Sequence, residues 1–131
     1  MHILIATRRP NELSAFADAL LRETGAQLLF ADSWTNVLAT VKVIPPAFVI
    51  LDVGLAEGKP LELARQLVTV NAMINTAVVS PLGAEEFHEA SEGLGILAPV
   101  PVNPTAEDGA ALALVFRRFM SLSRLNSGIR L

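Results

Sequence analysis

The stretch Phe48-Val49-Ile50-Leu51-Asp52 decides the fold of this chain. Four apolar residues in a row, with no polar residues alternating between them, are typical of a strand buried on both faces of a parallel sheet. An aspartate directly after such a strand has little reason to be there unless water or chemistry reaches it, although roughly a third of such residues only cap a loop or a helix. Asp52 is therefore the first candidate functional residue.

Further runs of the same kind flank this one along the chain. The predicted strands cover residues 2–6, 27–31, 47–52, 76–80 and 95–100. The segments between them carry apolar residues at helical spacing and are bordered by residues that start or stop helices. These borders are Pro10 and Gly25 for the first helix, Pro45 and Pro46 at the end of the second, and Pro60 at the start of the third.

The last two predicted helices differ in length and character. The fourth, at residues 84–91, is short and acidic, while the fifth follows Asn103 and Pro104, a cap and a first-turn proline, and runs to about Ser123. The apolar stripe of the fifth helix is wide enough to face a partner as well as the sheet. We expect residues 124–131 to form a C-terminal tail.

Five alternations of strand and helix predict one α/β domain over residues 1–123. Its fold is a doubly wound, five-stranded parallel sheet with helices on both faces, and the expected strand order is 2-1-3-4-5. In such sheets the working site lies beyond the carboxyl ends of the strands, where the strand order reverses. This rule selects Thr7, Arg8, Asp52, Ser80 and Val100 as pocket residues.

Composition excludes several classes of function. With a net charge of −3 and no run of Lys or Arg, the chain lacks the basic patch that nucleic-acid binding requires. It has no cysteine, so disulfides, thiolate metal sites and cysteine nucleophiles are excluded. The apolar start is broken by Arg8, Arg9 and Pro10, too early for a membrane span or a signal peptide. A cytoplasmic location is the resulting expectation.

Over residues 1 to about 123 the chain resembles the receiver domain of two-component response regulators, a flavodoxin-like fold. The resemblance rests on the Asp52 motif, on Ser80 at the family's switch Thr or Ser, on Pro101 of the family's Lys-Pro pair, and on Asn103-Pro104. It implies that an acidic pair after the first strand and Asp52 hold Mg²⁺, that Asp52 accepts a phosphoryl group from a histidine kinase, and that a lysine pairs with the phosphoryl oxygens.

The chain departs from the family at the residues that perform this chemistry. Thr7 and Arg8 stand at the acidic pair, and Val100 stands at the lysine. Further departures are Leu97 at the aromatic switch position, Ala56 at a usual proline, Pro60 at a usual glycine and Pro81 at a usual small residue. One carboxylate and one guanidinium remain, so we expect Mg²⁺ binding to be lost or very weak and no other cofactor to be bound.

Two local arrangements stay open. Arg8 either pairs with Asp52, which would lock a metal-free pocket, or points to solvent. Ser80 either hydrogen-bonds into the pocket or only caps the end of its strand.

The sequence favours an atypical, non-enzymatic receiver that acts by contact with signalling proteins, such as a histidine kinase or an effector. One alternative is a working phosphoacceptor at Asp52, and another is a small-ligand binder that uses the crevice at the strand-order reversal. A homodimer through the fourth helix, fifth strand and fifth helix is expected to use Phe116, Phe119 and Met120, unless these residues are ordinary core.

Overall fold

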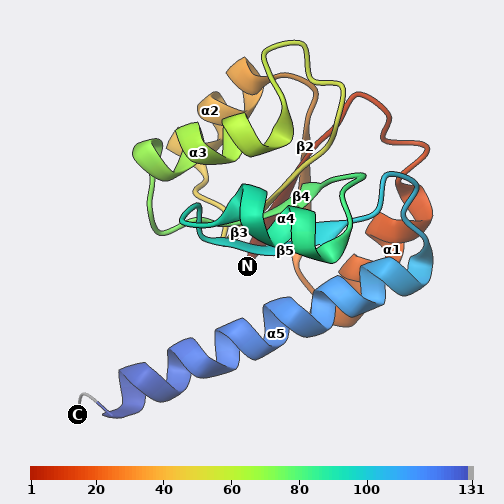
Figure 1. Cartoon of the computed structure of the whole chain (residues 1–131). Helices are drawn as coiled ribbons and strands as arrows, with labels where there is room; N and C mark the ends of the chain where they lie inside the picture. The colour runs from red at the N-terminus through yellow and green to blue at the C-terminus, as the bar shows by residue number, and fades with distance from the viewer. Residues whose placement is uncertain (130–131) are drawn as a thin grey trace.

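The computed structural model describes residues 1–129 of the chain, and the side chains of residues 1–122. Five parallel strands form one sheet in the order β2-β1-β3-β4-β5, as predicted. The strands are β1 (His2–Ala6), β2 (Gln27–Ala31), β3 (Phe48–Leu51), β4 (Asn75–Val79) and β5 (Ile96–Val100). The helices are α1 (Ser14–Thr24), α2 (Trp34–Val43), α3 (Pro60–Val70), α4 (Ala84–Ser91) and α5 (Ala106–Ile129). Figure 1 shows their arrangement.

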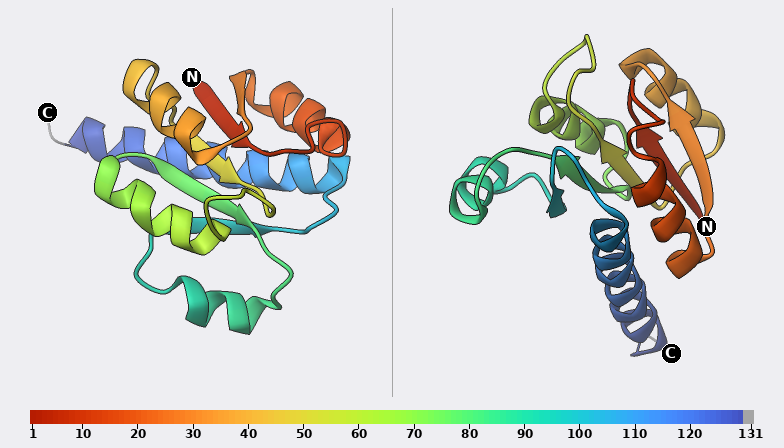
Figure 2. Two further views of the ribbon diagram at one scale, coloured as in Figure 1. Left: turned by 90° about the horizontal axis from the view of Figure 1, so that it is seen from above. Right: turned by 90° about the vertical axis from the view of Figure 1, so that its right-hand side faces the viewer.

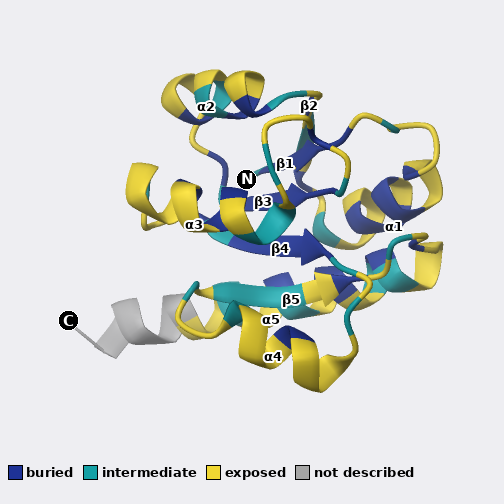
Figure 3. Cartoon of the chain, turned by 45° about the horizontal axis from the view of Figure 1, so that its top comes forward, coloured by how far each residue is buried: buried dark blue, intermediate teal, exposed yellow. Residues whose placement is uncertain are grey.

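The sheet is the middle of three layers, because right-handed crossovers place helices on both of its faces (Figure 2). Side chains alternate along each strand, so Ile3 and Ile5 of β1 join the core under α1 and α5, whereas Leu4 and Ala6 join the core under α2, α3 and α4. The central strands β1, β3 and β4 are buried almost throughout, and the edge strand β5 is largely half-buried (Figure 3).

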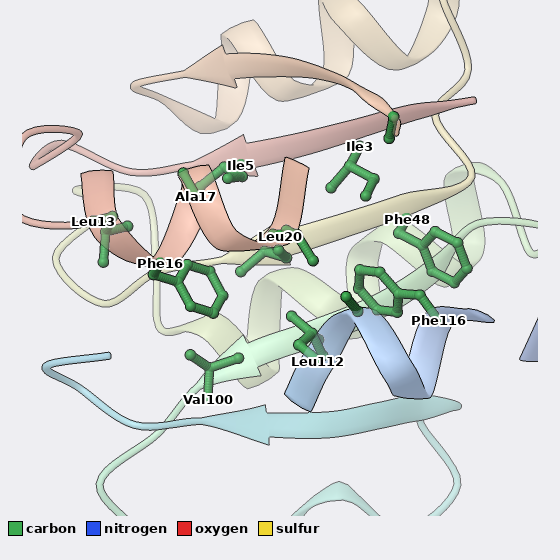
Figure 4. Packing of buried hydrophobic residues seen from close by; sticks show 14 of the residues in the cluster. Ile3, Ile5, Leu13, Phe16, Ala17, Leu20, Phe48, Val100, Leu112 and Phe116 are labelled. Carbon is green, nitrogen blue, oxygen red and sulfur yellow. The ribbon is translucent and has the colours of Figure 1, made fainter. Parts of the chain in front are cut away.

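The layer of α1 and α5 is tightly packed. The ring of Phe116 stacks on Phe48 with centroids 3.9 Å apart, and Phe16 and Leu20 of α1 fill the neighbouring space (Figure 4). Gly109 lets α5 approach α1 closely, since a Cβ at this position would collide with the carbonyl oxygen of Phe16. The two helices therefore form one unit against the sheet.

Three helix borders differ from the sequence prediction. α5 does not end near Ser123 but continues to Ile129, because no proline follows Ser123 and the first glycine after it is Gly128. Its N-terminal cap is Thr105 and not Asn103, since the Thr105 hydroxyl and the Asp108 carboxylate exchange hydrogen bonds with each other's backbone N–H groups. α1 begins at Ser14, four residues after Pro10, because residues 10–13 form a separate turn.

Strand β5 pairs irregularly with β4. Thr76 faces Ile96, but the next residue, Ala77, faces Ala98, so Leu97 is an extra residue in the edge strand. Its side chain packs against the core under α1 and α5. The residue at the family's aromatic switch position is thus an aliphatic side chain that belongs partly to the core.

Candidate functional site

Asp52 lies at the carboxyl end of β3, beside the end of β1, where the strand order reverses. Its backbone N–H donates to the carbonyl oxygen of Ala6 at 2.9 Å, which continues the pairing of the two strands by one residue. Its side chain has no exposure to solvent. A carboxylate buried in this way has to find hydrogen-bond donors or a cation within the protein.

Four N–H and O–H groups donate to the Asp52 carboxylate, two to each oxygen. Oδ2 accepts from the Thr7 hydroxyl at 2.7 Å and from Arg9 Nε at 2.8 Å. Oδ1 accepts from the backbone N–H of Val53 at 2.8 Å and from Arg9 Nη2 at 2.9 Å. The two bonds from Arg9 make a bidentate pair, which is the strong geometry for guanidinium and carboxylate.

Arg9 also holds two neighbouring segments. Its Nη2 group donates to the carbonyl oxygen of Val102 in the loop between β5 and α5, and its Nη1 group donates to Glu12 at 3.4 Å. The hydrogen bond to Asp52 raises the pKa of Arg9 above its ordinary value, although partial burial acts in the opposite direction. Arg9 therefore stays a cation at physiological pH and links the ends of β1, β3 and β5.

Of the two arrangements left open for Arg8, the structure shows the one that points to solvent: Arg8 is exposed, and the adjacent Arg9 makes the pair with Asp52. The in-and-out alternation of strand β1 continues past its end, so that Thr7 points inward, Arg8 outward and Arg9 inward again. The Thr7 hydroxyl also accepts from the backbone N–H of Arg9 at 3.0 Å, which turns the chain at this point. The alternation was a signal in the sequence that could have selected Arg9.

Of the other predicted pocket residues, Thr7 contacts Asp52, whereas Ser80 and Val100 do not hydrogen-bond to it. Ser80 accepts a hydrogen bond from the backbone N–H of Leu82 at 3.2 Å, so it caps the end of β4 locally. Val100 is buried in the core under α1 and α5. No hydrogen bond joins either residue to Asp52 among the residues that the structure describes.

The three candidate interface residues of α5 differ in how far they are buried. Phe116 is fully buried on Phe48, so for this residue the alternative of ordinary core holds. Phe119 packs edge-on against Phe48 at 6.1 Å between ring centroids, and both Phe119 and Met120 are half-buried. The large apolar side chains exposed on the described part of this helix are Leu114 and Leu122, neither of which was among the expected interface residues.

The donors around Asp52 do not fit Mg²⁺. This ion prefers several oxygen ligands in octahedral geometry, with carboxylates among them. Both Asp52 oxygens accept hydrogen bonds from Arg9, and another carboxylate, Glu12, contacts that same arginine. Over residues 1–122, no three His, Asp or Glu side chains are grouped so that they could hold a metal ion. The arrangement is that of a neutralised, hydrogen-bonded carboxylate.

Comparison with known proteins gives a likeness in structure alone. No family model matches the chain, and no curated protein matches its sequence. Among solved structures, NtrX from Brucella abortus matches 98% of the chain at 20% identity with a TM-score of 0.76, and the chain spans 28% of that NtrX chain. A two-component response regulator from Legionella pneumophila matches 92% of the chain at 15% identity, with a TM-score of 0.71 and 98% of its own length covered.

A third solved structure is the response regulator DrrB from Thermotoga maritima. It matches 93% of the chain at 16% identity with a TM-score of 0.74, and the match covers 53% of its own length. These matches confirm the expected resemblance at the level of the fold.

In the described part of the chain, no helix is both long and apolar enough to cross a membrane.

Proposed function

We propose that this chain, whose fold is that of response-regulator receiver domains, is an atypical, non-enzymatic receiver that signals by protein contact without Mg²⁺-dependent phosphorylation. The proposal rests on the bidentate pair between Arg9 and the Asp52 carboxylate, which solvent does not reach. The pair occupies the place where a working receiver would hold its metal ion. A cytoplasmic location and the absence of nucleic-acid binding remain part of the proposal.

The chemistry of phosphoryl transfer supports this assignment. A carboxylate oxygen has to attack phosphorus while cations neutralise the charge that develops on the phosphoryl oxygens. Each Asp52 oxygen already accepts two hydrogen bonds, so an attack requires Arg9 to leave and a buried charge to lose its partner. Val100 offers no ammonium group to the incoming phosphoryl group.

A phosphorylation assay tests the proposal. The chain is incubated with acetyl phosphate and Mg²⁺, and separately with beryllium fluoride and Mg²⁺, and is followed by intact mass and by Trp34 fluorescence. Trp34 is the only tryptophan, and its backbone N–H donates to Glu57 in the loop after Asp52, so its emission reports changes in that loop. The expected result is an unchanged mass and an unchanged emission.

A mass increase of one phosphoryl group that disappears in Asp52→Asn would overturn the proposal and establish the alternative, a working phosphoacceptor. Arg9→Ala serves as a comparison, because it exposes the carboxylate without supplying a second one. If Arg9→Ala is modified and the parent is not, Arg9 is the group that blocks the acceptor.

Signalling proteins, such as a kinase or an effector, and a second copy of the chain are the proposed partners. A homodimer would use the face of α4, β5 and α5, and on α5 the side chains able to contribute are the exposed Leu114 and Leu122 and the half-buried Phe119 and Met120. Light scattering of the parent and of Leu122→Glu tests this contact. A dimer that the charge converts to a monomer supports it, and a parent that is monomeric at high concentration rejects it.

A further inference from the structure

We propose that the cavity between α3 and the loop from β4 to α4 binds a small amphiphilic anion, meaning a molecule with an apolar body and one acidic group. The cavity has a volume of about 700 Å³, within the range of small-molecule sites. It opens at the carboxyl edge of the sheet, where ligands bind in folds of this kind. It is separate from the Arg9 side of Asp52, and binding there goes beyond the proposed protein-contact function.

The inner surface of the cavity is apolar. Its walls come from the loop after β3, from the start of α3, from the end of β4 and from α4. The apolar lining includes Val53, Leu61, Val79, Pro81, Leu82 and Ala90. Ser80 is the only uncharged polar side chain among the lining residues, and its oxygen already accepts from the backbone N–H of Leu82, so only its O–H group is left for a polar ligand. An apolar body fits this lining.

The charge at the rim selects an anion. Lys59 and Arg65 line the cavity together with a single carboxylate, Glu62, and the glutamates of α4 are not among its lining residues. Within the described side chains, both ion pairs are made by Arg9, so Lys59 and Arg65 have no carboxylate partner there. Asp52 directly precedes the lining residue Val53. Because Arg9 neutralises the charge of Asp52, this carboxylate does not repel an anion in the cavity.

Two walls of the cavity are loosely packed and leave room for an occupant. α4 is held to the sheet by one buried side chain, Phe87, and the other residues of this helix are exposed or half-buried. The opposite wall contains Gly54, which has a positive φ of 84° and open space where a Cβ would lie. An occupant would thus contact the segment Val53–Gly54 that follows Asp52, and the same loop carries Glu57, which contacts Trp34.

The test uses octanoate as the probe, with octylamine and octanol as matched cationic and neutral probes. Amide chemical shifts are recorded on the full chain during titration into the millimolar range, where a weak site is detected. We expect saturable shifts for residues that line the cavity, with octanoate binding more tightly than octanol and octylamine binding least. No saturable shift with octanoate, or shifts centred on the α5 surface around Leu114 and Leu122, would overturn the proposal.

Variants separate the apolar lining from the rim charges. Arg65→Gln should weaken octanoate roughly threefold, as expected for one exposed charge, and leave octanol unchanged. Arg118→Gln, an exposed arginine on α5, is the matched control and should change neither. Ala90→Phe, at an exposed position on α4, should fill the cavity and abolish binding of all three probes while the chain stays folded. Equal octanoate affinity in parent and Ala90→Phe would place the probe elsewhere and reject the site.

Discussion

Arg9 binds both carboxylate oxygens of Asp52 through two N–H groups, at 2.8 Å and 2.9 Å, across 43 residues of sequence. A cation of the chain itself thus neutralises the buried carboxylate at the end of β3. Because the same guanidinium also binds the carbonyl oxygen of Val102, the ends of three strands are linked through one side chain.

Removing the guanidinium should destabilise the fold. Arg9→Ala leaves the buried Asp52 carboxylate with only Thr7 and the Val53 N–H as donors, and breaking one side of such a pair costs about 3 to 5 kcal/mol. Urea unfolding gives the free energy directly. Arg8→Ala is the matched control, and it should unfold like the parent because Arg8 is exposed. Equal effects of the two variants would show that the pair does not form.

Removing the charge of Asp52 should cost less than removing Arg9. In Asp52→Asn the guanidinium loses its ionic partner, but it is partly exposed and regains water, so we expect a loss of about 2 kcal/mol. The double variant Arg9→Ala with Asp52→Asn should lose less unfolding free energy than the sum of the two single losses. We expect the difference to be about 2 kcal/mol. Additive losses in this cycle would contradict a direct interaction.

A second carboxylate should create a Mg²⁺ site. Thr7→Asp combined with Arg9→Ala places two carboxylates at the ends of β1 and β3 and removes the competing cation. We expect millimolar Mg²⁺ to raise the thermal midpoint of this variant, since a ligand that binds the folded state alone stabilises it. Parent and Arg9→Ala should not respond. A response of the parent that saturates with Mg²⁺ would refute our account of the pocket.

The contact of α1 with α5 depends on Gly109. Gly109→Ala introduces a Cβ that collides with the Phe16 carbonyl oxygen and lies 3.1 Å from the Ala19 Cβ, so the helices have to separate. We expect a loss of at least about 2 kcal/mol in unfolding free energy. Gly83→Ala, where the added Cβ meets nothing within 4 Å, should cost no more than about 1 kcal/mol, the effect of alanine at the N-cap of α4. A stable Gly109→Ala would mean that the two helices are less closely packed.

Phe116 and Leu122 lie on one helix but should differ in their contribution to stability. Phe116 is fully buried and stacks on Phe48, so Phe116→Ala should cost about 3 to 5 kcal/mol through lost burial and a cavity. Leu122 is 61% exposed, and Leu122→Ala should change the free energy by less than about 0.5 kcal/mol. Chemical denaturation of both variants measures this. Similar losses would indicate that Leu122 is covered, as a dimer would require.

Local sequence was sufficient for the architecture. Continuous apolar runs such as Phe48 to Leu51 occur in strands covered on both faces, and the right-handed crossover rule then leaves few strand orders, of which 2-1-3-4-5 is the observed one. The position of Asp52 at the edge of the sheet follows from the same pattern. The strands and the position of Asp52 depend on residues that are neighbours in the chain, so the sequence contains them directly, and the crossover rule then limits the strand order.

Only the tertiary structure showed which individual side chains contact each other. Arg8 and Arg9 have the same chemistry, and only the path of the backbone after β1 turns Arg9 toward Asp52. Phe116 and Leu122 both belong to the apolar side chains of α5, and the distance between this helix and the sheet decides that one is core and the other exposed. The cavity beside α3 exists because segments far apart in sequence leave a space between them, a property that no local pattern records.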